Sequence, residues 1–419
     1  MITFLINALK LIFLLGFLVF IHEGGHFIVA KLCKVKVNEF AIGFGPTLLK
    51  FTKGETKYAL RLIPLGGFVS MEGEDERSEK EGSFSKTSIP KRMGIILAGA
   101  IVNIIFGLLI YFIIASFSGS FYTTTVDYML EDYAAINNGI QANDKIIAIN
   151  NQKVKNKNQI SEVINKTNGE ELNILVKRDN DYINLKFKPT VIKNKDIGIY
   201  FKANREDTKI MSIEKGSPAE KAGLKVNDEI IKIDSIEIKN DAYKITELIQ
   251  KNDKEEITLI IKRDNNILEI EVQPNITETY FLGIVFRKAE NTFINNIYYG
   301  GIETKEFLLS IGDNLKQIFT GRAKVNQMMG VVGISEVVTN TSGLQEYVYM
   351  IAVISLSLGI TNLLPFPPLD GGKFILLIIE LIRKKPIKEE LEIQIQMIGF
   401  SILIGLSIYV TYNDILRIL

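Results

Sequence analysis

The 419-residue sequence predicts a polytopic α-helical membrane protein with two small α+β domains inserted between its second and third membrane helices. Two observations support this fold class: four long apolar runs that carry little charge, and an internal repeat between the second run and the third. The 49 Lys and Arg residues are balanced by 48 Asp and Glu residues, which lacks the basic excess of proteins that coat nucleic acid. We therefore expect no nucleic-acid partner.

The apolar runs are long enough to cross a bilayer. Residues 93–117 carry no charge, and their 117 − 93 + 1 = 25 positions exceed the roughly 20 that span a hydrocarbon core of about 30 Å. The other predicted membrane helices cover residues 1–30, 346–372 and 396–413. The first run lacks both the basic start and the small-residue cleavage site of a secretion signal, so we expect it to remain as an anchor.

Positive charge gathers in two short loops. Residues 31–92 contain 12 Lys and Arg residues, and residues 383–388 contain 4. The positive-inside rule places both loops in the cytoplasm and the long segment 118–345 on the opposite side of the membrane.

The long segment contains a duplicated domain. Residues 138–149 match residues 222–233 at an offset of 84, and Pro189 matches Pro274 at an offset of 85. A unit of this size is larger than a solenoid repeat. Each copy combines short β-branched strands with a single helix, at Gln159–Lys166 and Tyr243–Gln250.

Both histidines of the chain lie in one pentapeptide, His22-Glu23-Gly24-Gly25-His26. On a helix, residues four apart share a face, so both imidazoles can reach one metal ion. Glu23 then lies beside the metal, where it can take a proton from a water molecule. The sequence therefore predicts a catalytic metal centre in the first membrane helix.

A catalytic zinc site uses three protein ligands and leaves one position open. Since the chain has no third histidine, the third ligand must be a carboxylate, and Asp370 is the candidate. Pro365 and its neighbouring prolines end the third helix, and Gly371 and Gly372 permit a close backbone approach. We expect Asp370 just past that helix, near the cytoplasmic end and at the depth of His22.

Three other interpretations compete with a metalloprotease. The histidine pair could be hydrogen-bonded core polarity or a proton relay, although ionisable groups inside a membrane are usually functional. The chain could be a membrane-anchored scaffold or chaperone without proteolytic activity. It could also be a metal-ion transporter, for which Asn103 is the main further polar residue in the apolar helices.

These motifs resemble the site-2 protease family of intramembrane zinc metalloproteases, in its regulator-of-sigma-E protease branch with two tandem PDZ domains. The marks are His22 to His26, and Asn362, Pro365, Asp370 and Gly371 in the pattern N-x-x-P-x-x-x-x-D-G. Further marks are Gly43-Phe44-Gly45-Pro46, a stretch at about 57–71 similar to the family's membrane-associated β-hairpin, and Leu97–Asn103, with Ala100 where proline is usual.

The repeat copies resemble PDZ domains. Ser217-Pro-Ala-Glu-Lys-Ala-Gly-Leu-Lys-Val-Asn-Asp228 is similar to the PDZ signature S-P-A-x-x-A-G-L-x-x-G-D, with Asn227 in place of glycine. This assigns residues 199–275 to a second PDZ domain. Residues 120–195 lack the Ser-Pro pair and are assigned to a first PDZ domain through the repeat.

The resemblance implies a zinc endopeptidase of the bacterial inner membrane, with its active site near the cytoplasm and its PDZ domains outside. By this resemblance, Glu23 is expected to be the catalytic base. The zinc ligands are expected to be His22, His26 and Asp370. Asn362 is expected to orient the peptide or to stabilise the oxyanion. The implied substrate is a single-pass membrane protein already trimmed outside, such as an anti-sigma factor.

The roles of three parts stay open at this point. The hairpin could bind an extended substrate as an added strand, or be purely structural. The PDZ domains could bind peptide C-termini or exclude untrimmed substrates by size. Residues 290–330 read as an amphipathic helical segment that either lies on the lipid bilayer or packs on the PDZ domains.

Overall fold

The computed structural model describes residues 2–74, 76–117, 121–201, 208–239, 241–320, 329–341 and 343–418. The chain forms two compact units. The membrane unit comprises Met1–Gly119 and Asn291–Leu419, and the repeat unit comprises Ser120–Glu290. Each unit has its own hydrophobic cores.

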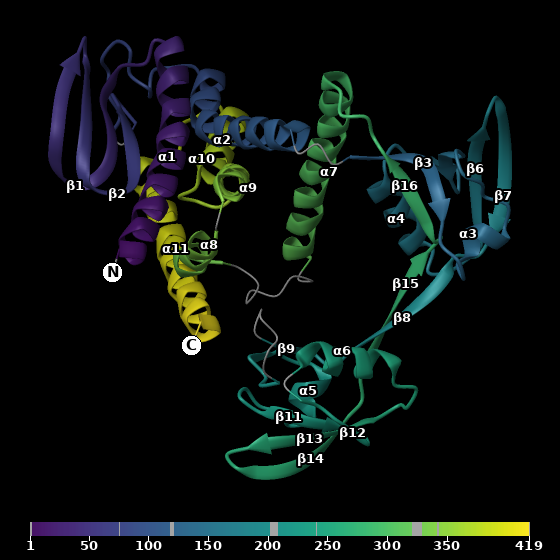
Figure 1. The fold of residues 1–419 in the computed structure, drawn as a ribbon. Coiled ribbons are helices and arrows are strands. Elements are labelled where there is room, and N and C mark those ends of the chain that lie inside the picture. The colour runs from purple at the N-terminus through teal and green to yellow at the C-terminus, as the bar shows by residue number, and fades with distance from the viewer. Residues whose placement is uncertain are drawn as a thin grey trace. The chain divides into compact units, whose positions relative to one another are not determined.

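Four helices of the membrane unit are long and apolar enough to cross a bilayer, among the residues that the structure describes. They are α1 (Ile2–Leu32), α2 (Ile89–Phe117), α9 (Leu344–Asn362) and α11 (Glu389–Ile418) (Figure 1). The predicted spans 1–30, 93–117 and 396–413 fall on α1, α2 and α11, and the first part of 346–372 falls on α9.

Helix α2 approaches both α1 and α9 closely through glycines. A Cβ atom at Gly25 of α1 would lie 2.6 Å from the carbonyl oxygen of Ala98, and one at Gly359 of α9 would lie 2.7 Å from that of Ala100. Small residues let helix backbones touch in a membrane, where no hydrophobic effect drives helices together. These glycines therefore bring α2 against both neighbours at the level of His22 and His26.

The predicted end of the third helix at the prolines is confirmed, and the predicted range 346–372 is corrected because its last residues begin a separate helix. Helix α9 ends at Asn362, residues 363–369 form a tight turn, and a separate helix α10 (Asp370–Arg383) begins at Asp370. The turn contains three prolines, which lack the N–H that an unbroken helix needs. A Cβ atom at Gly371 would overlap the carbonyl oxygens of Leu363 and Leu364, so the turn packs directly on the start of α10.

The predicted hairpin at 57–71 is one half of a larger sheet. Strands β1 (Val37–Lys53) and β2 (Thr56–Met71) both bend, so that pairing runs over four segments in the order 67–71, 37–42, 57–61 and 47–53. The bend in β1 is the Gly43-Phe44-Gly45-Pro46 motif, whose two glycines have φ values of +87° and +81°. Segment 67–71 is an edge of this sheet and has no further strand partner among the described residues.

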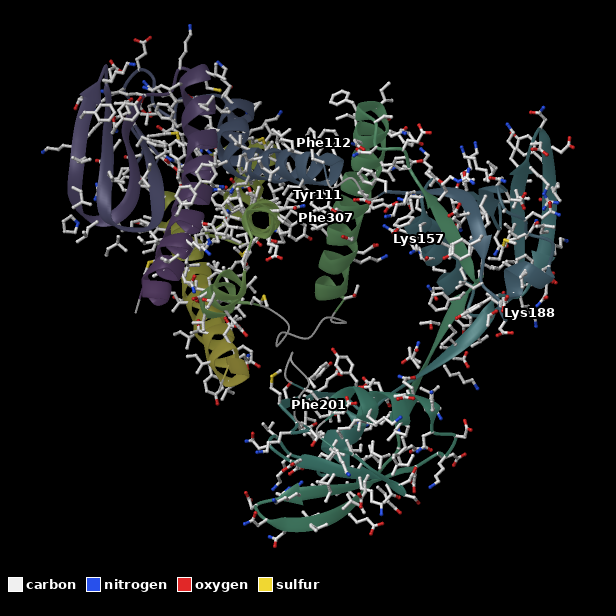
Figure 2. The ribbon with its side chains drawn as sticks, in the orientation of Figure 1. Tyr111, Phe112, Lys157, Lys188, Phe201 and Phe307 are labelled. Carbon is white, nitrogen blue, oxygen red and sulfur yellow. The ribbon has the colours of Figure 1, made fainter. Side chains whose placement is uncertain are left out.

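Helix α7 (Phe293–Phe319) occupies most of the predicted amphipathic segment 290–330. Its Phe307 stacks on Tyr111 of α2, with ring centroids 4.1 Å apart and planes 2° from parallel (Figure 2). Phe293, Ile294 and Leu309 of the same helix are exposed. Residues 321–328 of the predicted segment, and the side chains of its apolar residues Leu315, Ile318 and Phe319, lie outside the described part of the chain.

Helix α8 (Val331–Asn340) is anchored on α11 by a buried carboxylate. Asp414 Oδ2 accepts hydrogen bonds from the backbone N–H groups of Gly330, at 2.9 Å, and Gly333, at 2.8 Å. A carboxylate satisfies the unpaired N–H groups at a helix N-terminus and is favoured there by the helix dipole.

The repeat unit has two lobes of the same design. The first lobe contains β3 (Tyr122–Met129), α3 (Ala134–Asn137), β4 (Lys145–Ile149), β5 (Gln152–Lys153), α4 (Lys157–Lys166), β6 (Leu172–Arg178), β7 (Asp181–Phe187) and β16 (Ile284–Lys288). The second contains β9 (Ile199–Tyr200), β10 (Ser212–Ile213), α5 (Pro218–Lys221), β11 (Glu229–Ile233), β12 (Ile236–Glu237), α6 (Ala242–Lys251), β13 (Ile257–Arg263) and β14 (Asn266–Val272).

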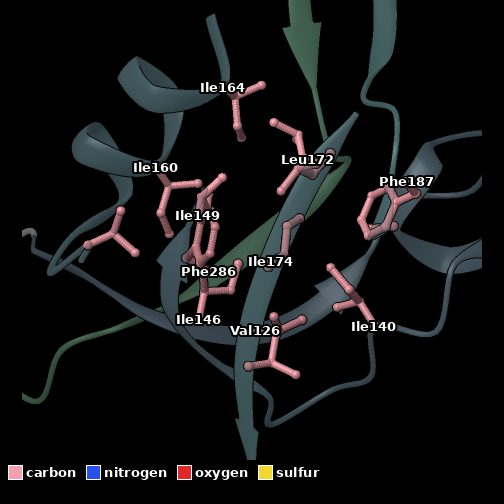
Figure 3. Packing of buried hydrophobic residues seen from close by; sticks show 14 residues of the cluster. Val126, Ile140, Ile146, Ile149, Ile160, Ile164, Leu172, Ile174, Phe187 and Phe286 are labelled. Atoms are coloured by element: carbon pink, nitrogen blue, oxygen red, sulfur yellow. The ribbon is translucent and has the colours of Figure 1, made fainter. Parts of the chain in front are cut away.

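The second lobe is inserted into the first. The sheet order of the first lobe is β16-β3-β4-β6-β7, and β16 follows the whole second lobe in the chain. Phe286 of β16 lies in the first lobe's core with Ile146 and Ile174 (Figure 3). Strands β8 (Thr190–Asp196) and β15 (Asn275–Phe281) pair along their length and join the lobes. The first domain thus extends beyond the predicted 120–195, because β3 and β16 pair across the insertion.

The same ion pair supports each lobe, and it accounts for the most similar residues of the repeat. Asp144 is fully buried and receives Arg178 Nε at 2.7 Å and Nη2 at 2.8 Å, while Asp228 receives the corresponding two nitrogens of Arg263, both at 2.7 Å. Each guanidinium also donates to a glycine carbonyl, that of Gly139 or Gly223. Two-point contacts of this kind are among the stronger hydrogen bonds in proteins.

We expect Arg178→Leu to destabilise the first lobe selectively, because it leaves the buried Asp144 carboxylate without its charged partner. Loss of hydrogen bonds to a charged group costs about 1.5–3 kcal/mol. Amide hydrogen exchange should accelerate in β4 and β6. Arg263→Leu is the matched control and should accelerate exchange in β11 and β13 instead. Equal effects of either variant on both lobes would contradict this assignment.

Candidate metal centre

The two histidines converge because α1 is an unbroken helix through residues 22–26. His22 and His26 lie one turn apart on one face, and their Nε2 atoms are 3.2 Å from each other. His22 is buried and His26 is half-buried. This is the arrangement that the four-residue spacing predicts.

Asp370 reaches the same point from α10. Its Oδ2 atom lies 3.3 Å from His22 Nε2 and 3.5 Å from His26 Nε2. Oδ2 is buried and has no hydrogen-bond partner among the described residues. The structure therefore brings together the three residues that the sequence nominates as metal ligands, although 344 positions separate His26 from Asp370 (370 − 26).

The size of this triangle fits zinc. Ligand atoms at about 2.0–2.1 Å from a tetrahedral zinc ion lie about 3.3–3.4 Å from one another. The three edges here are 3.2, 3.3 and 3.5 Å. Where lone pairs of all three atoms face one another, the atoms repel unless a cation lies between them. Two imidazoles and one carboxylate would leave the fourth position of a zinc ion free for water.

Helix α2 orients one imidazole and makes room for both. His26 Nδ1 lies 2.8 Å from the carbonyl oxygen of Ile95, to which it can only donate, so its Nε2 atom carries the lone pair. One turn further, a Cβ atom at Gly99 would overlap His26 Nε2 and lie 2.8 Å from His22 Cε1. Only glycine leaves space for the two rings at this position.

The triangle opens into a cavity of about 380 Å³. Glu23 lines it beside the histidines, together with Phe68–Met71 of the sheet edge, Glu74, Ile96 and Lys373. A Cβ atom at Gly67 would lie 3.3 Å from Glu23 Cγ, so the edge segment 67–71 passes directly beside the candidate base. We call the three atoms His22 Nε2, His26 Nε2 and Asp370 Oδ2 the metal triangle. The candidate base, the metal triangle and the strand edge thus line one cavity.

Lys373 and Glu74 are cavity residues that the sequence analysis did not identify. Lys373 Nζ lies 3.3 Å from Glu74 Oε1, and both side chains are half-buried. Lys373 follows Asp370 by three positions on α10, which puts the two on one helix face. That spacing was a usable signal, but it requires knowing that a helix begins at Asp370.

The remaining predicted residues are not among the residues that line the cavity. Asn362 is the last residue of α9, is half-buried and does not line the cavity. Pro365 belongs to the turn and is exposed, while Gly371 packs against the turn. Gly43 to Pro46 form the bend of the sheet.

Comparison with known proteins gives matches over almost the whole chain. The model of peptidase family M50 matches residues 10–406. The regulator of sigma E protease of Haemophilus influenzae is 27% identical over 446 residues, which cover 99% of this chain and 100% of that protein. A putative zinc metalloprotease of Helicobacter pylori J99 is 28% identical over 415 residues, 97% of this chain and 99% of that protein. A putative zinc metalloprotease of Streptococcus pyogenes is 30% identical over 446 residues, 99% of this chain and 100% of that protein.

We expect Gly99→Ala to weaken metal binding at least tenfold, because the added methyl group collides with both imidazole rings. Zinc affinity would be measured by competition with a chelator on the purified protein. Gly94→Ala is the matched control on the same helix, since a Cβ atom there meets nothing within 4 Å. Asp370→Ala, which removes a candidate ligand, sets the scale for full loss. Wild-type affinity in Gly99→Ala would refute the close packing of α2 on the metal triangle.

Proposed function

Because the chain belongs to peptidase family M50, we propose that this metalloendopeptidase cleaves a single-pass membrane protein within or near its transmembrane segment. The observation that carries the proposal is the convergence of His22, His26 and Asp370 in one cavity with Glu23. The four apolar helices support cleavage inside the membrane.

In the proposed mechanism His22, His26 and Asp370 would hold a zinc ion, the metal in the names of the relatives. Bound zinc supplies Lewis acidity, which lowers the pKa of water and polarises a peptide carbonyl. Glu23 accepts the proton of the attacking water and then donates it to the amine that leaves. This division of roles needs a carboxylate that lines the cavity without belonging to the metal triangle, and Glu23 has that position.

The negative charge that develops on the carbonyl oxygen needs a donor or a cation nearby. The resemblance assigns this role to Asn362, but Asn362 does not line the cavity. Lys373 does line it, three positions after Asp370. We assign the electrostatic role to Lys373 and keep Asn362 as a residue that orients the substrate or caps α9.

The substrate binds in extended form along segment 67–71. A helical transmembrane segment must unwind before its peptide bonds are accessible, and a strand edge stabilises the unwound chain through backbone hydrogen bonds. The edge lies beside Glu23 and lines the cavity, which favours this role over a purely structural sheet. The name of the Haemophilus influenzae relative links it to sigma E, so a trimmed membrane-anchored anti-sigma factor is the substrate class we propose.

The repeat unit lies outside the cytoplasm in this proposal, and the host membrane is the bacterial inner membrane. The Lys and Arg residues of 31–92 and 383–388 support a cytoplasmic position of both loops. The lobes are proposed to be PDZ domains that either capture peptide C-termini or exclude untrimmed substrates by size. The second lobe supports this through Ser217, which caps α5 by accepting from the N–H of Glu220.

We expect Tyr200→Cys and Lys385→Cys to react on opposite sides of the membrane. Both would be made in a Cys33→Ser background, because Cys33 is the only cysteine. Both positions are exposed. On intact cells a membrane-impermeant maleimide should label residue 200 and leave residue 385 unlabelled until the cells are permeabilised. Labelling of both from the same side would rule out the proposed orientation.

We expect Glu23→Gln to abolish cleavage, with a loss of at least 10²-fold, because glutamine cannot accept and return the proton. The assay would use purified protein with a co-expressed single-pass substrate, and zinc content would be measured in parallel. Zinc should stay bound, since Glu23 is not one of the three ligands. Glu171→Gln, an exposed change in the repeat unit, is the control. Equal cleavage by Glu23→Gln and wild type would overturn the mechanism and favour a scaffold.

A further inference from the structure

Asn103 of α2 is a fully buried amide in an apolar helix, and its only described side-chain neighbour within hydrogen-bonding range is a metal-site histidine. Its Nδ2 atom lies 3.4 Å from His22 Nδ1. Its Oδ1 atom is buried without a partner among the described residues. A buried carbonyl oxygen without a hydrogen bond is costly, so the hydrogen bonding of this amide is incomplete when Nδ2 faces His22.

The metal triangle dictates where the second nitrogen of each imidazole points. Because the two Nε2 atoms converge, the two Nδ1 atoms face away from each other, and their partners must be farther apart than the histidines themselves. His26 Nδ1 meets the Ile95 carbonyl. Asn103 lies eight residues beyond Ile95 on α2, which is about 12 Å along the helix. Ile95, Gly99 and Asn103 therefore form one stripe of α2 that flanks both rings.

The orientation of the amide decides what His22 can do. If Asn103 donates to Nδ1, then the proton of neutral His22 is on Nε2 and that nitrogen cannot bind a metal ion. A half-turn of the amide exchanges its oxygen and nitrogen with little change of shape. Oδ1 then accepts from Nδ1–H, the unpaired oxygen gains a partner, and Nε2 carries the lone pair that the triangle requires.

We infer that Asn103 Oδ1 accepts the Nδ1–H of His22 and is the positioning residue that fixes the metal-binding tautomer of this histidine. The inference rests on the proposed metalloprotease function. Asn103 does for His22 what the Ile95 carbonyl does for His26. Such partners of metal-bound histidines raise ligand basicity, and their loss typically lowers metal affinity 10–100-fold.

Helix packing is the alternative role for Asn103, and the contacts argue against it. Ser355 of α9 donates its hydroxyl to the backbone carbonyl of Asn103 at 2.9 Å, so the polar contact between α2 and α9 at this level does not use the Asn103 side chain. The side chain is directed at His22 instead. Because the Asn103 backbone contacts α9 and its side chain faces His22, helix packing and histidine positioning can be tested by separate substitutions.

The experiment measures zinc affinity of the purified full-length protein by chelator competition. Asn103→Leu keeps the approximate volume and removes the acceptor, and we expect affinity to fall 10–100-fold. Asn103→Asp keeps an acceptor in place and should restore most of the affinity. Ser355→Ala breaks the neighbouring contact between α2 and α9 and should leave zinc affinity unchanged.

A second readout is the ¹⁵N chemical shift of His22 Nδ1 in the zinc-loaded protein, where the chain's two histidines give few signals. Asn103→Leu should change this shift by removing the acceptor and leave that of His26 nearly unchanged. Unaltered affinity in Asn103→Leu, or equal losses in Asn103→Leu and Asn103→Asp, would overturn the inference while the proposed function stands. A wild-type protein without zinc would overturn both.

Discussion

The close approach of His22, His26 and Asp370, whose Nε2 and Oδ2 atoms lie within 3.5 Å of one another, is the constraint on which the arrangement of α1, α2 and α10 depends. Two imidazoles and a carboxylate are costly to bury together, and they repel wherever lone pairs face one another with no proton or metal ion between them. The helices must therefore hold the rings in place against that repulsion. Helix α2 does so by lying against α1 at Gly25 and Gly99, close enough for its own backbone to hydrogen-bond an imidazole.

The break in the third membrane helix serves the same constraint. In a continuous helix, Asp370 would lie about two turns beyond Asn362 along the same axis. The turn at 363–369 instead ends α9, and Asp370 lies in the first turn of α10. A helix N-terminus favours a carboxylate. The glycines after Asp370 then allow the turn to fold back on α10 without a side chain in between. The prolines and glycines here together position Asp370 beside the two histidines.

The sequence predicted the features that depend on the local spacing of residues or on the small number of histidines. His22 and His26 meet because four residues make about one helical turn. Asp370 was identified because a zinc site in a chain with two histidines would need a carboxylate as its third ligand. The sequence did not predict α10, because the proline-rich segment gave no signal that a new helix begins at Asp370. It also did not predict that Lys373 lines the cavity, since this depends on where α10 begins. Segment 37–42 lies between two parts of β2, and β16 joins β3 across an inserted lobe. Such pairings link distant residues and leave no periodic pattern in either strand.

The repeat unit is an inserted cassette whose two ends lie next to each other, because the second lobe is inserted into the first. Its first and last strands are neighbours, and at their margin the N–H of Ala289 donates to the carbonyl of Phe121 at 2.9 Å. Insertions with adjacent ends disturb the host fold little, which is why such sites tolerate the gain and loss of domains. A helical protease lacking the cassette would need only a short splice between α2 and α7. The repeat unit is therefore separable from the rest of the chain at a single junction, and the second lobe is joined to the first in the same way, through the paired strands β8 and β15.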